Sequence, residues 1–128
     1  MSFLRKLFGR EVEDAEDAPI TLDLERRRTQ LLRLEKALDA LATEMRAERT
    51  TDDPGWRGRV NEYSRLAGQA QLERQGTPTR ESLLDLVFEV RPLFTGEIPP
   101  AMAPIGPLQD EVMAAAGDLR QLLPGEKG

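Results

Sequence analysis

The chain of 128 residues contains neither cysteine nor histidine. These absences exclude disulfides, thiolate nucleophiles, imidazole catalysis and the usual zinc ligands. No stretch reaches the ~18 apolar residues that a transmembrane helix needs. Arg5 and Lys6 also interrupt the first apolar residues, so we expect no signal peptide. We therefore expect a cytoplasmic protein, peripheral to the membrane at most.

Aromatic residues are scarce, at 5% of the chain, and β-branched runs are missing. The apolar residues are mainly leucine and alanine, which favours helix over sheet. The net charge of -5 argues against a nucleic-acid partner. Fifteen arginines against three lysines indicate a GC-rich genome.

The strongest helical signal lies between Leu22 and Arg49, where neither glycine nor proline occurs. We expect Thr21 to cap this helix. Leucine and methionine recur in two rows with a seven-residue period, broken by Arg27 and Glu48. The rows form either an intramolecular core or an oligomer seam, through Leu24, Leu31, Leu34, Leu38, Leu41 and Met45. This pattern predicts an all-α fold, a three- or four-helix bundle built on one long heptad-patterned helix.

Proline and glycine mark a second helix after a short connection. Asp53 can cap it and Pro54 can open it, and it should end near Arg74, before Gly76. The short connection predicts that the two helices are antiparallel neighbours. Gly58 and Gly68 would weaken this helix but permit close helix approach.

Two shorter helices follow. Thr77 and Pro78 repeat the cap-and-proline start, and Arg91-Pro92 should end the third helix. A strand is the competing interpretation of its second half. Residues 95–107 are rich in proline and predict an extended connection. A last helix is expected over 108–123, which completes a helical domain over 21–123 and leaves 124–128 as a disordered tail.

The first ten residues, here called the N-terminal decapeptide, separate apolar from basic side chains. On a helical wheel one half carries Phe3, Leu4, Leu7 and Phe8, and the other half carries Arg5, Lys6 and Arg10. This composition is typical of short amphipathic helices that lie on anionic membranes, and it resembles the termini of many bacterial peripheral-membrane proteins. Packing against the protein's own helices, docking in a partner's groove and disorder are the alternatives.

Residues 11–20 form an acidic linker with Glu11, Glu13, Asp14, Glu16 and Asp17. It lacks the glycine and the glutamate spacing of a calcium loop, so we expect no metal site. Ser64 and Ser82 have no histidine to activate them, and no phosphate-binding loop occurs. We therefore predict a protein that is not an enzyme and binds no cofactor.

These features predict a small bacterial adaptor or scaffold. It would self-associate or bind a partner helix, and it would reach the membrane surface through the N-terminal decapeptide. The first alternative is a soluble helical interaction subunit of a larger complex without membrane contact. The second is a regulator or enzyme with a small-ligand pocket between its helices.

Overall fold

The computed structural model describes residues 22–48 and 53–126, here called the helical body. These residues form four α-helices and one 3-10 helix, and none of them forms a strand. The all-α prediction is therefore confirmed for the helical body. The helices, in chain order, are α1 (Leu24–Ala47), α2 (Pro54–Gln75), α3 (Arg80–Glu89), η3 (Pro100–Met102) and α4 (Ile105–Arg120).

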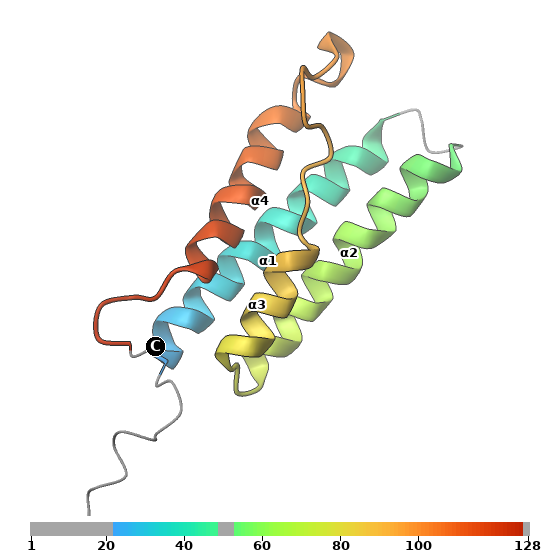
Figure 1. The fold of residues 1–128 in the computed structure, drawn as a ribbon. Helices are drawn as coiled ribbons and strands as arrows, with labels where there is room; N and C mark the ends of the chain where they lie inside the picture. The colour runs from blue at the N-terminus through green and yellow to red at the C-terminus, as the bar shows by residue number, and fades with distance from the viewer. Residues whose placement is uncertain (1–21, 49–52, 127–128) are drawn as a thin grey trace, which may run out of the picture.

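Helix α1 runs through the middle of the molecule, with α2 along one side and α4 along the other (Figure 1). Helices α1 and α2 run antiparallel, as their short connection predicts. The short helix α3 contacts both α2 and α4, and the segment that follows it runs back along the molecule. One continuous core results, because every α-helix contributes buried apolar side chains to it.

The start of α1 differs from the prediction. Asp23, not Thr21, is the N-cap, and its carboxylate accepts a hydrogen bond from the Arg26 N–H at 3.2 Å. Aspartate is a strong cap because, besides accepting this hydrogen bond, its negative charge interacts favourably with the positive end of the helix dipole. Helix α1 ends at Ala47, where the backbone of Glu48 turns to an extended conformation.

Helix α2 begins as predicted, with Asp53 as cap and Pro54 in the first turn, and its C-cap is Gly76. The role expected for its glycines is wrong. A Cβ added at Gly58 or Gly68 would meet nothing within 4 Å, so neither glycine permits a close approach. The side chain of Trp56 lies partly against the core, and its indole N–H donates to the Met45 carbonyl at 2.9 Å.

Helix α3 starts two residues later than predicted. Thr79 is its cap, and Thr79 and Ser82 exchange hydrogen bonds between side chain and backbone at 2.9 and 3.0 Å. This reciprocal capping box satisfies two backbone N–H groups at the start of the helix. The strand alternative is wrong, because a strand would place Leu86 and Phe88 on one face. Leu86 is buried, whereas Phe88 is 73% exposed.

The segment between α3 and α4 is held by side chains rather than by regular structure. The buried Gln109 amide donates to the Phe94 carbonyl at 2.9 Å and accepts from the Phe94 N–H at 2.7 Å. The Tyr63 hydroxyl donates to the Arg91 carbonyl at 2.6 Å. These bonds supply the backbone partners that an extended chain over a core requires.

After residue 94 the structure differs from the sequence prediction in three respects. Residues 95–107 are not wholly irregular, because they include η3 and the first turn of α4. Pro107 fits inside α4, since the first turn needs no backbone donor there. Helix α4 ends at Arg120, so Leu122 lies beyond it and is 44% exposed. A disordered tail from residue 124 is wrong for 124–126, because Glu126 binds back to the start of α1.

No helix of the helical body is long and apolar enough to cross a bilayer.

Candidate functional site

The predicted membrane-contact residues lie outside the described residues. The set comprises Phe3, Leu4, Arg5, Lys6, Leu7, Phe8 and Arg10. The structure does describe the place where the chain that follows these residues enters the helical body. That place is the start of α1, next to the end of α2 and the end of α4.

The predicted seam residues of α1 lie almost entirely in the core. Five of them are fully buried against helices of the same chain, namely Leu31, Leu34, Leu38, Leu41 and Met45. Leu24, at the first turn, is partly exposed. As placed, the five buried residues offer no surface to a second copy, so a contact between copies requires another surface of the protein.

Arg27 and Glu126 form an ion pair at the start of α1. Their side chains are 2% and 0% exposed. The Arg27 Nε donates to Glu126 Oε2 at 2.8 Å, and its Nη2 donates to Oε1 at 2.5 Å. The remaining guanidinium donors reach the carbonyls of Leu119 at 2.9 Å and Gln121 at 2.6 Å, and the side-chain oxygen of Gln30 at 3.2 Å. The guanidinium thus joins the start of α1 to the chain that leaves α4.

The carboxylate of Glu126 also accepts backbone hydrogen bonds. The N–H of Asp23 donates to it at 2.9 Å and the N–H of Leu123 at 2.6 Å. Burial raises the pKa of Glu126, but the hydrogen bonds from Arg27, Leu123 and Asp23 outweigh burial. The net effect lowers its pKa from the ordinary 4.5 to about 2. Glu126 is therefore ionised at neutral pH and fixes the backbone where α1 begins.

Asp23 and Arg27 are spaced i,i+4 on the chain but do not pair with each other. The Asp23 carboxylate lies 3.5 Å from the Arg26 guanidinium, and Arg27 turns inward to Glu126. Arg28 donates to the backbone carbonyls of Arg74 at 3.1 Å and Gly76 at 2.9 Å. Sequence reasoning missed these roles because their partners lie 46 to 99 residues away.

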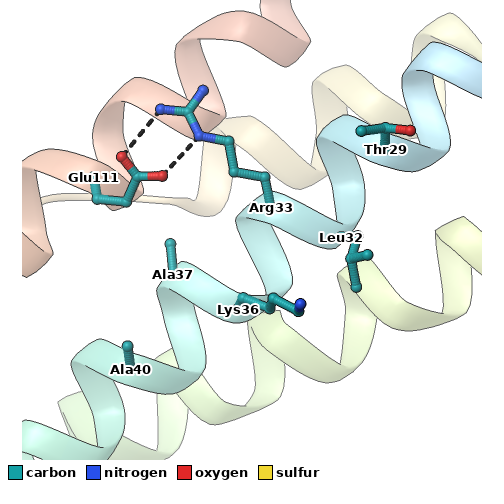
Figure 2. A pocket seen from close by; sticks show the side chains of 7 residues that line it. All are labelled: Thr29, Leu32, Arg33, Lys36, Ala37, Ala40 and Glu111. Carbon is teal, nitrogen blue, oxygen red and sulfur yellow. Dashed lines mark hydrogen bonds and ion pairs between the residues drawn. The ribbon is translucent and has the colours of Figure 1, made fainter.

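The side of α1 that faces away from the core carries three shallow hollows, of about 460, 410 and 420 Å³. Thr29 lines all three. The largest lies along the border with α4, and Figure 2 shows the side chains around it. The hollows follow a row of exposed or partly exposed residues, here called the outer face of α1, namely Glu25, Thr29, Leu32, Lys36, Asp39, Ala40 and Thr43.

Arg33 closes the α4 side of the largest hollow. Its guanidinium donates to both carboxylate oxygens of Glu111, at 2.7 and 3.0 Å, and to Asp118 at 2.5 Å. In Figure 2 Arg33 reaches across to Glu111, while Lys36 points away from it. The hydrogen bond from Arg33 lowers the pKa of Glu111. The positive charge of Arg33 is thus neutralised within the chain.

The two serine hydroxyl groups of the helical body form structural hydrogen bonds. Ser64 accepts from Arg46 at 2.5 Å, and Ser82 belongs to the α3 capping box and donates to Glu73 at 2.7 Å. Among the described residues no three acidic side chains gather as metal ligands would. The hollows of the outer face are open and shallow, which is unlike the enclosed pocket of a small-ligand site.

Comparison of the chain with protein-family models, with curated proteins and with solved structures gave no match.

Proposed function

We propose that this protein is a non-enzymatic bacterial adaptor or scaffold that reaches an anionic membrane surface through its N-terminal decapeptide. The observation that carries the proposal is the full separation of the four large apolar side chains of the decapeptide from its three cations. Such a helix buries its apolar side in the lipid interface while its cations meet anionic headgroups, at roughly 1 kcal/mol each.

The helical body supports this proposal through the end from which the decapeptide extends. Leu72, near the end of α2, is 64% exposed, and Leu122, beyond α4, is 44% exposed. Arg28 bonds the start of α1 to the end of α2, and Arg27 bonds it to Gln121, so both leucines lie near the start of α1. The acidic linker of ten residues spans at most about 35 Å, which keeps the helical body close to the surface.

We propose that the four helices act as a bundle built on α1. The bundle would keep its own core covered and leave the apolar side of the decapeptide to contact the membrane. The magnitudes predict weak, reversible attachment. Burying four large side chains contributes at most ~6–12 kcal/mol, and ordering eight backbone residues costs ~8–16 kcal/mol. Two decapeptides on one dimer would bind much better, because the second binds at high effective concentration.

Vesicle flotation tests the proposal. The full chain should float with vesicles that contain phosphatidylglycerol and should not float with pure phosphatidylcholine, and added salt should reduce flotation. The matched control exchanges two neighbours, Lys6→Leu with Leu7→Lys, which keeps composition and charge but places a cation within the apolar side. If this variant, or a chain without residues 1–10, floats as well as the wild type, the proposal is wrong.

A second candidate is a soluble interaction subunit, and Phe88 favours it. This side chain is 73% exposed on α3, where an aromatic ring without cover is a typical protein contact. A photo-crosslinking residue at position 88, compared with one at the exposed Asp85, measures this directly. One discrete crosslinked product at 88 with no vesicle flotation would favour the interaction subunit over the membrane adaptor.

A further inference from the structure

We propose that the outer face of α1 binds a second copy of this chain, as an antiparallel pair related by a two-fold axis. The inference deepens the proposed function, because it provides the dimer that makes two weak membrane contacts effective. The starts of the two α1 helices lie at opposite ends of the pair, so both decapeptides reach one membrane when the α1 helices lie along its surface. It replaces the leucine seam as the surface for self-association, since five of the seam residues are fully buried within one chain.

The shape of the outer face fits a copy of itself. Helix α1 forms a ridge, with one hollow along its border with α4 and another along its border with α2. In a two-fold pair the ridge of each copy can lie in a hollow of the other, which is the self-complementary contact that symmetric dimers require. Small side chains along the ridge, Thr29, Ala40 and Thr43, permit a close approach.

The charges of the outer face fit the same arrangement. Lys36 and Asp39 are both exposed, and neither forms an ion pair within the helical body. Lys36 and Asp39 are three positions apart on α1. In an antiparallel pair with its two-fold axis between positions 37 and 38, Lys36 of each copy therefore lies opposite Asp39 of the other copy. The same register places Leu32 opposite Thr43 of the second copy. Arg33 stays out of the contact, because Glu111 and Asp118 already bind it.

The second copy explains the outer face better than the decapeptide does. The decapeptide carries four large apolar side chains, whereas Leu32 is the one large apolar side chain on the outer face. The cations of the decapeptide would also be repelled by the positive charge of Lys36. A copy of the outer face instead brings opposite charges and small residues together.

The size of the outer face predicts a weak dimer. Helix α1 has 24 residues and is about 36 Å long. The hollows extend the contact toward α4 and α2, and one interhelical distance of roughly 9 Å on each side gives a width of roughly 18 Å. The resulting area of roughly 600 Å² per copy lies below the ~800 Å² of a standard interface. We therefore expect a dissociation constant in the micromolar range.

Sedimentation velocity of the full chain without lipid tests the proposal. We expect a monomer–dimer equilibrium, and Lys36→Glu or Asp39→Lys alone should raise the dissociation constant at least tenfold, about 1.4 kcal/mol. The double exchange Lys36→Asp with Asp39→Lys should restore dimerisation. Asp85→Lys, on α3, is the matched control and should change nothing. Circular dichroism should show all variants folded, because the replaced side chains are exposed.

The absence of cysteine in the native chain provides a second readout. A short bismaleimide should crosslink Ala40→Cys into dimers and should leave Gln71→Cys, on the exposed side of α2, monomeric. A chain that stays monomeric, single reversals without effect, or dimers that form only after residues 1–10 are deleted would each overturn the proposal. Vesicles are absent from both assays, so a failure here is distinct from a failure to float.

Discussion

Replacing Glu126 with glutamine removes the charge that pairs with Arg27 but keeps the side-chain shape. Because the two side chains are 0% and 2% exposed, the variant leaves a buried guanidinium with carbonyl partners alone. Breaking a buried pair from one side typically costs 3–5 kcal/mol. Some of this cost is avoided here, since Gln30, Leu119 and Gln121 still accept hydrogen bonds from the Arg27 guanidinium. We therefore expect Glu126→Gln to lower the free energy of unfolding by about 2–3 kcal/mol at pH 7.

The pKa of Glu126 gives an independent magnitude and the pH window. A drop from 4.5 to about 2 corresponds to at most about 3 kcal/mol, at ~1.36 kcal/mol per pKa unit. Because the folded state holds the pKa below its unfolded value, the stabilisation is complete above pH 4.5. It is lost as the pH falls toward 2, where folded Glu126 becomes protonated. The difference between wild type and Glu126→Gln should therefore shrink over this window.

Urea denaturation followed by circular dichroism measures these differences. Hydrogen exchange adds a local readout, because the N–H groups of Asp23 and Leu123 bond to Glu126 and should lose protection in the variant. Arg26→Met is the matched control, since Arg26 is 58% exposed and should change stability by less than ~0.5 kcal/mol. If Glu126→Gln unfolds like the wild type with unchanged exchange at both amides, the reasoning is refuted.

Three other substitutions test the packing of the helical body by the same denaturation assay. Gln109→Ala should cost about 2 kcal/mol, because it leaves the N–H and carbonyl of Phe94 unpaired; an unchanged midpoint would contradict this. Tyr63→Phe should cost ~1 kcal/mol through the lost bond to Arg91, and burial should make the wild-type phenol ionise above pH 10 in an ultraviolet titration. Gly68→Ala should stabilise the protein by up to ~1 kcal/mol, since the added Cβ meets open space; a loss of stability would show a close contact there.

The sequence predicted the elements where local chemistry decides. Asp53 followed by Pro54 predicted the start of α2, and the leucine rows predicted the buried side of α1. The cap of α3 could also have been found. Thr79 and Ser82 have the spacing of a capping box, but Thr77 followed by proline gave a competing signal, and the reciprocal hydrogen bonds decide in favour of Thr79.

The contacts of Arg27 and Glu126 at the start of α1 could not be predicted in the same way. Arg27 interrupts a leucine row, which indicates a guanidinium turned toward the core and in need of a carboxylate. Nothing local identifies Glu126 as that carboxylate, because it lies 99 residues away in a segment whose proline and glycine predict disorder. Pairing of this kind depends on how α1 and α4 come together, and periodicity alone does not encode it.

The most direct test of membrane attachment follows single side chains of the decapeptide. Because the chain has no native cysteine, Leu4→Cys and Gly9→Cys can each carry one environment-sensitive fluorophore, on opposite sides of the predicted helix. On vesicles containing phosphatidylglycerol, the label at position 4 should shift to shorter wavelength and the label at position 9 should stay close to its value in water. Equal shifts at both positions, or no shift at position 4, would contradict the account.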